Sequence, residues 1–175
     1  KPSSGEVVCA SRPYYVPQHF GQFDHLTVAE ALRVDGPIKA LHAILAGDAS
    51  VENFTRLNDD WSVEERCLSA LAFWDLGHLQ LSQPMHLLSG GEKTKVFLSG
   101  ISVHTPEIIL MDEPTNHLDI SSRDKLYEMV RTGRSTLLIV SHDRTLLNLL
   151  PGICELERNG VTLYGGNYDF YREQK

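Results

Sequence analysis

The apolar residues of this chain recur with two different spacings. Short, almost entirely apolar runs at 108–111 and 136–140 have the length of strands that are buried on both faces, as in a parallel sheet covered by helices. From residue 26 to 87 the pattern becomes helical, and one stripe of 62–76 carries Val63, Cys67, Leu71 and Trp74. The pattern therefore predicts an α/β protein with a helical part.

Capping and turn residues predict the remaining elements. Thr27, Ser50 and Ser62 stand where helices begin, and Gly133 stands where one ends. In chain order we expect a strand at 7–10, helices at 28–33, 37–46, 90–104, 120–131 and 143–150, a β-hairpin of 153–157 and 161–164 turning near Asn159-Gly160, and a last helix after 165.

Two carboxylates follow the run 108–111 at once. Asp112 and Glu113 stand at the carboxyl end of a predicted strand, where open α/β sheets bind ligands. An Asp there can hold Mg²⁺, and the Glu beside it can orient or deprotonate a water molecule. The pair indicates nucleotide hydrolysis.

Upstream, Leu88-Ser89-Gly90-Gly91-Glu92 precedes the helix 90–104. Ser89 and Glu92 fit a capping box, which only starts a helix. Two consecutive glycines are costly at a helix start that needs no close approach, however, and bare backbone N–H groups at a helix N-terminus bind anions. We therefore interpret the glycines as a phosphate contact.

Together these residues resemble the ATP-binding-cassette (ABC) ATPases. Leu88–Glu92 is similar to the family signature motif, Ile108–Glu113 to Walker B, and Asn116–Asp119 to the D-loop. The resemblance implies a P-loop NTPase core at 1–23 and 105–175, a helical subdomain at 24–104 that includes the signature helix, and ATP with Mg²⁺ as cofactors.

The resemblance also implies roles for single residues. Gln18 matches the Q-loop glutamine and Asp112 the Walker B aspartate, so both are expected at the Mg²⁺ site, with Glu113 acting on the attacking water. His142, in Ser141-His-Asp-Arg after the run 136–140, matches the H-switch that contacts the γ-phosphate. The alternative is that Ser141 merely caps the helix at 143–150.

One family element is absent from the sequence. The phosphate-cradling loop GxxxxGK[ST] does not occur, and none of the 13 glycines is followed by lysine. In the resembled family this loop precedes the strand matched by 7–10, and we expect its own strand beside Walker B. We therefore interpret the chain as a fragment that starts just after the loop.

Three further features resemble the ABC-F branch, soluble proteins with two cassettes that act on the ribosome in translation or antibiotic resistance. They are Asn-His at 116–117, Ser-His-Asp-Arg at 141–144 and Gly-Asn-Tyr-x-x-Tyr at 166–171. The resemblance implies an ATP-gated clamp of two cassettes. It implies that Ser89, Gly90 and Gly91 serve the partner's nucleotide, whereas Asp112, Glu113 and His142 serve the cassette's own. The other residues expected to bind nucleotide are Gln18, Glu92, Asn116, His117 and Asp119.

Two other functions stay open. The chain could be the ATP-binding subunit of a membrane transporter, although transporter cassettes usually carry small residues where Asn116-His117 stand. It could also be a non-catalytic cassette that only pairs with another.

Composition limits the cellular location and the binding partners that we expect. Apolar content of 42% and charged content of 22% are those of a globular protein, and no apolar run reaches the length of a membrane span, so we expect a cytoplasmic protein without direct membrane contact. The net charge of −7 gives no basic surface for RNA, so contact with ribosomal RNA has to come from a local patch or another part of the protein. Cys9, Cys67 and Cys154 are expected as buried thiols, and Trp61 and Trp74 as core residues.

The missing phosphate loop generates a first prediction. Without it, Asp112 and Glu113 lack the groups that hold the β- and γ-phosphates. The 175 residues alone are expected to bind Mg-ATP weakly and not to turn it over. Isothermal titration checks this, and micromolar affinity for Mg-ATP would contradict it.

Overall fold

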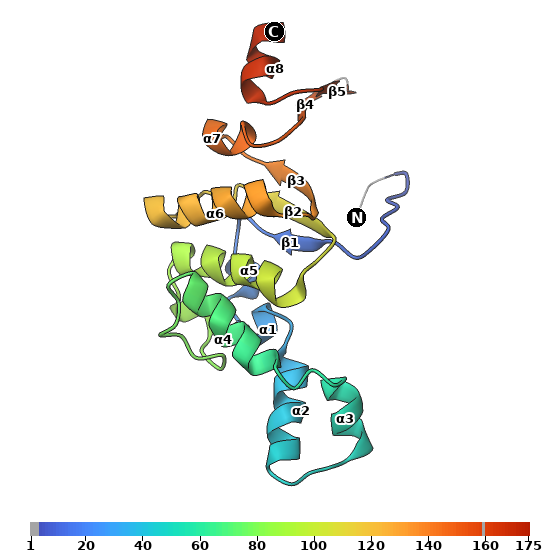
Figure 1. Ribbon diagram of the computed structural model, residues 1–175, viewed down its shortest axis with the longest axis vertical. Coiled ribbons are helices and arrows are strands. Elements are labelled where there is room, and N and C mark those ends of the chain that lie inside the picture. Colours follow the sequence, from blue (N-terminus) through green and yellow to red (C-terminus); the bar gives the residue numbers. More distant parts are fainter. Residues whose placement is uncertain (1–3, 159) are drawn as a thin grey trace.

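The computed structural model describes residues 4–158 and 160–175, so Asn159 of the predicted hairpin turn lies outside the described residues. Its centre is a parallel sheet in the order β1-β2-β3, formed by Tyr14–Val16, Ile108–Asp112 and Thr136–Val140 (Figure 1). In the register, Val16 pairs with Met111 and Asp112 with Val140. The α/β class predicted from the sequence is confirmed.

Helices separate and follow these strands. In chain order they are α1 (Val28–Ala31), α2 (Asp35–Leu45), α3 (Val51–Leu57), α4 (Val63–Phe73), α5 (Gly90–His104), α6 (Ile120–Thr132), α7 (Arg144–Leu147) and α8 (Tyr168–Gln174), with short 3-10 turns at Gly21–Phe23 and Met85–Leu87. An antiparallel hairpin of β4 (Ile153–Glu157) and β5 (Gly160–Tyr164) stands before α8. The predicted helix 90–104 and the predicted hairpin are both confirmed.

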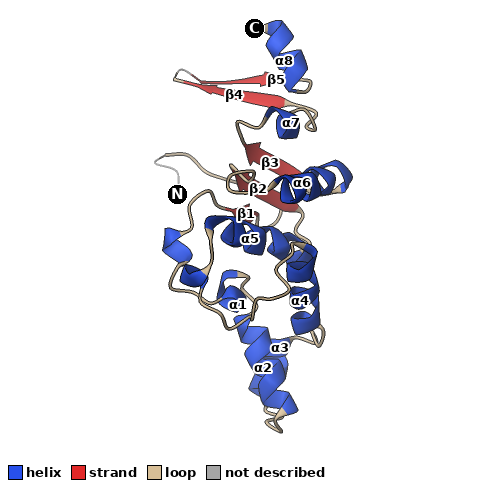
Figure 2. Ribbon diagram, turned by 90° about the vertical axis from the view of Figure 1, so that its left-hand side faces the viewer, coloured by secondary structure: helices blue, strands red, loops and turns tan. Residues whose placement is uncertain are grey.

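The molecule is elongated. Helices α1 to α4 form one end, the sheet lies in the middle, and the hairpin with α8 forms the other end (Figures 1 and 2). The predicted stripe on α4 is buried: Val63, Cys67, Leu71 and Trp74 are each at most 1% exposed. Burial also raises the pKa of the Cys67 thiol to about 11.

Helix α5 joins the helical end to the sheet. The buried hydroxyl of Tyr14 on β1 donates to the carbonyl oxygen of Phe97 on α5 at 2.9 Å. A Cβ atom at Gly100 would lie only 1.8 Å from that hydroxyl oxygen, so only glycine lets the helix approach the strand this closely. The signature helix is thereby fixed against the sheet.

The sheet differs from the prediction in how it is covered. Strand β3 alternates between half-buried and exposed residues, and Leu138 and Val140 are each 59% exposed. Strand β2 alternates between buried and half-buried residues. The expectation of strands buried on both faces was wrong because the described helices cover only one face of the sheet.

The N-terminal strand was also placed wrongly. Residues 7–10 form no strand, and Val7 and Val8 are 71% and 83% exposed; the strand lies at Tyr14–Val16 instead. Nor can a phosphate-loop strand lie beside β2, because β1 and β3 occupy both of its edges. Any further strand has to be added outside β1 or β3.

Several local expectations were wrong because exposure depends on neighbours distant in sequence. Of the three cysteines expected to be buried, Cys9 and Cys154 are exposed, and Trp61, expected in the core, is 48% exposed. Ser62 makes no capping hydrogen bond; its hydroxyl accepts from Arg66. Asp143 rather than Ser141 caps α7, with hydrogen bonds from the N–H groups of Thr145 and Leu146.

The contact between α5 and β1 gives a prediction on stability. Gly100→Ala is expected to lower the free energy of unfolding by about 3 kcal/mol, because the added methyl group collides with the buried Tyr14 ring. Gly36→Ala is the matched control within α2, where the nearest atoms to the new Cβ lie 3.9 Å away. It should leave stability unchanged or raise it by up to about 1 kcal/mol. Urea unfolding followed by circular dichroism checks both, and equal midpoints for the two variants would contradict the packing.

Candidate functional site

The candidate site lies at the edge of the sheet where the three parallel strands end. Glu113 directly follows β2 in a left-handed conformation with φ of 48°. Its N–H donates to the carbonyl oxygen of Val140 at 2.8 Å, and the residue is only 8% exposed. The end of β3 therefore holds the backbone of Glu113 in a strained turn.

His142 meets Glu113 at this edge. Its Nε2 atom lies 3.5 Å from Oε1 of Glu113, and its backbone N–H donates to Oε2 at 3.4 Å. Within the described residues the imidazole has no other hydrogen-bond or ion-pair partner. Its side chain is 99% exposed, whereas that of Glu113 is 9% exposed. The structure thus brings together the two residues that the sequence predicts as catalytic, one sheltered and one open to a ligand.

Asp112 and Gln18 lie at the same edge. Oδ2 of Asp112 accepts a long hydrogen bond from the Tyr15 hydroxyl at 3.4 Å. Burial, and then the charge of Asp112 and this hydrogen bond, raise the pKa of Tyr15, so the phenol keeps its proton. Gln18 follows Val16, which pairs with Met111, and so it is placed near Asp112 by the strand register. Its side chain makes no hydrogen bond within the described residues.

At the start of α5, Ser89 and Glu92 form the capping box that the sequence left open as the alternative to a phosphate site. The Ser89 hydroxyl accepts from the N–H of Glu92 at 3.3 Å, and the Ser89 N–H donates to Oε2 of Glu92 at 2.8 Å. Hydrogen bonds from the Ser89 hydroxyl and N–H lower the pKa of Glu92. Ser89 and Gly90 are exposed and Gly91 is half-buried, so this helix start remains accessible to a second molecule.

The two glycines have a structural reason that the sequence did not reveal. A Cβ atom at Gly91 would lie 2.6 Å from the carbonyl oxygen of His117, and one at Gly90 would lie 3.4 Å from Cγ of the His117 ring. Packing within the chain is therefore a second reason for a glycine at 91, and the expected phosphate contact stays a prediction. Close packing of the helix start on the loop 116–119 requires a glycine at 91, whereas a Cβ atom at Gly90 would only touch the His117 ring.

The loop that follows Glu113 is tied at both ends. The N–H of Asn116 donates to the carbonyl oxygen of Glu113 at 3.1 Å. At the other end Asp119 caps α6, where its Oδ1 accepts from the N–H of Ser122 at 2.8 Å. Oδ2 of Asp119 accepts a hydrogen bond from Nζ of Lys95 on α5 at 2.9 Å. His117, at φ of 63°, is exposed between these fixed points.

Sequence reasoning missed Tyr15 as the partner of Asp112 and gave no role to Lys95. The alternation of β1, which buries Tyr14 and Val16 and exposes Tyr15, is the signal for the first residue. No local signal pairs Lys95 with Asp119, because 24 positions separate them.

The site suits a metal that needs few protein ligands. Within 4–158 and 160–175, no three His, Cys, Asp or Glu side chains gather as a metal cluster. Mg²⁺ is usually bound through one or two carboxylates together with water and substrate phosphates. The Asp112 carboxylate and the Gln18 amide, both oxygen donors at one edge, fit that ion.

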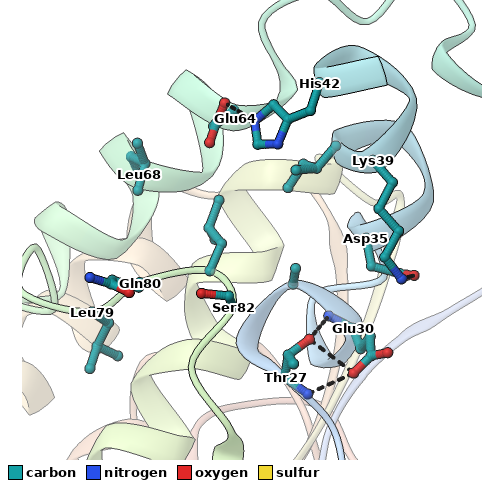
Figure 3. Close-up of a pocket in the computed structure, with 13 residues that line it drawn as sticks. Thr27, Glu30, Asp35, Lys39, His42, Glu64, Leu68, Leu79, Gln80 and Ser82 are labelled. Atoms are coloured by element: carbon teal, nitrogen blue, oxygen red, sulfur yellow. Dashed lines mark hydrogen bonds and ion pairs between the residues drawn. The ribbon is translucent and has the colours of Figure 1, made fainter. Parts of the chain in front are cut away.

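A separate cavity of about 480 Å³ lies among α1, α2, α4 and residues 79–82 (Figure 3). Its charged groups are satisfied within the chain: Lys39 pairs with Asp35 at 3.2 Å, His42 with Glu64 at 2.9 Å, and Glu30 accepts from Thr27 at 2.8 Å. None of its lining residues comes from the edge where Glu113 and His142 meet. The cavity is therefore distinct from the candidate site.

With this geometry established, comparison with known proteins identifies the family. Residues 9–116 match the family described as ABC transporter. The chain belongs to the ABC transporter family. It is an ATP-binding cassette domain, and cassettes of this family bind and hydrolyse ATP.

Curated relatives of this ABC cassette include the ATP-binding protein Uup of Escherichia coli, 39% identical over 116 residues that cover 66% of the chain and 18% of Uup. ABC transporter F family member 2 of Arabidopsis thaliana is 28% identical over 175 residues, covering 99% of the chain and 23% of that protein. The cassette chain thus spans about a fifth of the length of these relatives.

Solved structures support the fold. An ATP-binding subunit of an ABC transporter has a TM-score of 0.63 at 23% identity and covers 92% of this chain and 61% of that chain. A dimeric bacterial ABC transporter cassette has a TM-score of 0.56 at 22% identity and covers 82% and 57%. The P-loop NTPase fold predicted from the sequence is therefore confirmed. In the described part of the cassette, no helix is both long and apolar enough to cross a membrane.

The contact between α5 and the loop 116–119 yields a prediction. Gly91→Ala is expected to lower the free energy of unfolding by about 2 kcal/mol, because the new methyl group collides with a backbone oxygen that cannot move alone. Gly90→Ala is the matched variant one residue earlier; it should cost less, because the His117 ring can swing away. Adding His117→Ala should relieve Gly90→Ala but not Gly91→Ala. Chemical unfolding of the four variants checks this, and relief of both glycine variants would contradict it.

Proposed function

We propose that this cassette belongs to an ABC-F type ATPase and closes face to face with a second cassette around Mg-ATP. The observation that carries the proposal is the approach of His142 to Glu113 at 3.5 Å at the edge where the parallel strands end. A buried carboxylate beside an exposed imidazole is an arrangement that can hold and activate a water molecule next to a phosphate. The ABC-F relative that aligns over 99% of the chain supports the choice of branch.

Each residue of the cassette's own half of the site has a proposed task. Asp112 and Gln18 hold Mg²⁺, which when bound neutralises charge on the phosphates. Glu113 orients the attacking water and takes its proton. His142 donates a hydrogen bond to the γ-phosphate and keeps the water against Glu113.

The other half-site is proposed to serve the partner's nucleotide. The N-terminus of α5 presents Ser89, Gly90 and Gly91 at the surface, and its backbone N–H groups and dipole favour an anion. Glu92 supports that turn through the capping box. The loop residue His117 lies against this helix start, Asp119 pairs with Lys95 one turn further along α5, and Asn116 precedes them in the same loop. Dimeric cassettes among the solved structures of similar fold support pairing of this kind.

The proposal also covers the complete protein, its location in the cell and its target. As in the ABC-F branch, the complete protein is proposed to act in the cytoplasm as an ATP-gated clamp on the ribosome, in translation or in protection against antibiotics. With a net charge of −7, the cassette leaves most RNA contact to other parts of the protein. We divide the cassette into an α/β core at 1–23 and 105–175 and a helical subdomain at 24–104. The similarity to transporter cassettes concerns the fold, so it does not argue for transport.

Glu113→Gln in the complete gene product tests the proposal. The amide cannot accept the proton of the attacking water, so kcat for ATP hydrolysis is expected to fall by about 100-fold or more. The clamp should then stay closed, and the fraction that co-sediments with ribosomes in ATP should rise.

Glu107→Gln is the matched control, because Glu107 is exposed and directly precedes β2 at the opposite end from Glu113. It should change neither kcat nor ribosome binding. Unchanged hydrolysis in Glu113→Gln would overturn the catalytic assignment, and absence of ATP-dependent co-sedimentation would overturn the ribosomal role.

A further inference from the structure

Lys95 on α5 is nearly withdrawn from solvent although it is charged. Its side chain is 12% exposed, and its Nζ atom lies 2.9 Å from Oδ2 of Asp119. A lysine so far removed from water is stabilised by its ion pair, and loss of the pair would leave it without compensation. The contact joins the helix that starts at the signature residues to the last residue of the loop after Glu113.

Both oxygens of Asp119 are occupied within the chain. Oδ1 accepts from the N–H of Ser122 at 2.8 Å and from the Ser121 hydroxyl at 2.7 Å, and Oδ2 accepts from Lys95. These hydrogen bonds, with that of Lys95 the strongest, hold the pKa of Asp119 far below its usual range. Asp119 therefore stays ionised, and its carboxylate fixes the loop to α5 and to the start of α6.

A second contact joins the same two segments. Gly91 packs so closely on the carbonyl oxygen of His117 that a Cβ atom would lie 2.6 Å from it. Gly91 and Lys95 are four residues apart and so lie on one face of α5. That face holds the loop at two points, His117 and Asp119.

The loop 116–119 connects these contacts with α5 to the edge of the sheet where Glu113 lies. The N–H of Asn116 donates to the carbonyl oxygen of Glu113 at 3.1 Å, and the N–H of Glu113 donates to Val140 at 2.8 Å. Because Glu113 has φ of 48°, its carboxylate keeps its direction only while the surrounding backbone is held. A displacement of the loop is therefore expected to turn Glu113 away from His142.

We infer that Lys95 is a positioning residue that, through Asp119, aligns Glu113 with the signature start of the same cassette. The inference rests on the proposed function and extends it. The half-site that a cassette offers to its partner and the half-site that it keeps for itself are joined by this ion pair and by the packing of Gly91 on His117. A shift of one half-site is therefore expected to move the other. Lys95 touches no reacting atom, and it acts on hydrolysis only through the loop.

The test is steady-state ATPase kinetics on the complete gene product with Lys95→Met. Methionine keeps most of the length of the side chain and removes the charge. We expect kcat to fall about tenfold, with KM for ATP within about twofold of the original. Lys95→Arg retains the charge and should keep at least about half of kcat. Circular dichroism melting should show a shift of less than about 3 °C for the Lys95→Met and Lys95→Arg variants, because the carboxylate that Lys95→Met leaves without its partner, Asp119, is largely exposed.

Lys93→Met is the matched control. Lys93 stands two positions earlier on α5, is 13% exposed, and pairs with Asp24 at 2.5 Å instead of with the loop 116–119. It should leave kcat within about twofold. Equal kcat for the Lys95→Met and Lys93→Met variants would overturn the inference.

A double-mutant cycle with Asp119→Asn makes the test specific to the pair. Asparagine still accepts the capping hydrogen bond but loses the charge that Lys95 meets. Lys95→Met, Asp119→Asn and the double variant are expected to share one reduced kcat, since each removes the same contact. If the reductions in kcat of the two single variants multiply in the double variant, the inference is overturned. If the unaltered protein hydrolyses ATP no faster than Glu113→Gln, the proposed function itself fails.

Discussion

Parallel hydrogen bonding on both edges of β2 is the constraint on which the rest of this structure depends. Because β1 and β3 run in the same direction as β2, the segments that leave the three strands meet at one edge. Asp112 and Glu113 come from a part of the chain distant from His142, and the β2–β3 pairing brings them together. Gln18 stands two residues beyond β1 and so leaves the sheet at the same edge. The bond between the N–H of Glu113 and Val140 extends the β2–β3 pairing by one residue, into the turn that directs the carboxylate.

Elements specified by neighbouring residues could be predicted from the sequence. The bounds of α5 were predicted correctly because Ser89 and Glu92 carry their own start signal, and the hairpin because its two short strands flank a turn. Features that depend on which strands pair, or on which face of the sheet the helices cover, could not be predicted. Val7 and Val8 have a strand-like composition but no partner strand, and Leu138 and Val140 have a core-like composition on a face that the described helices leave open.

The candidate site, too, could be predicted only in part. The meeting of Glu113 with His142 could be expected, because each directly follows a predicted strand or stands two residues beyond one. The contacts that orient the site could not, since Tyr15 lies 97 positions from Asp112 and Lys95 lies 24 positions from Asp119. The glycines illustrate the limit most clearly. Their need for close approach was visible in the sequence, but the approaching group is the backbone of the cassette's own loop.

The exposure of His142 has a consequence for when the proposed reaction can run. An imidazole that is 99% exposed and touches the protein only near Glu113 keeps much of its rotational freedom. That freedom has to be given up before the ring can serve a phosphate, at a cost of about 1 kcal/mol for a side chain of this size. Under the proposed function, docking of a second cassette over this edge would supply part of that ordering.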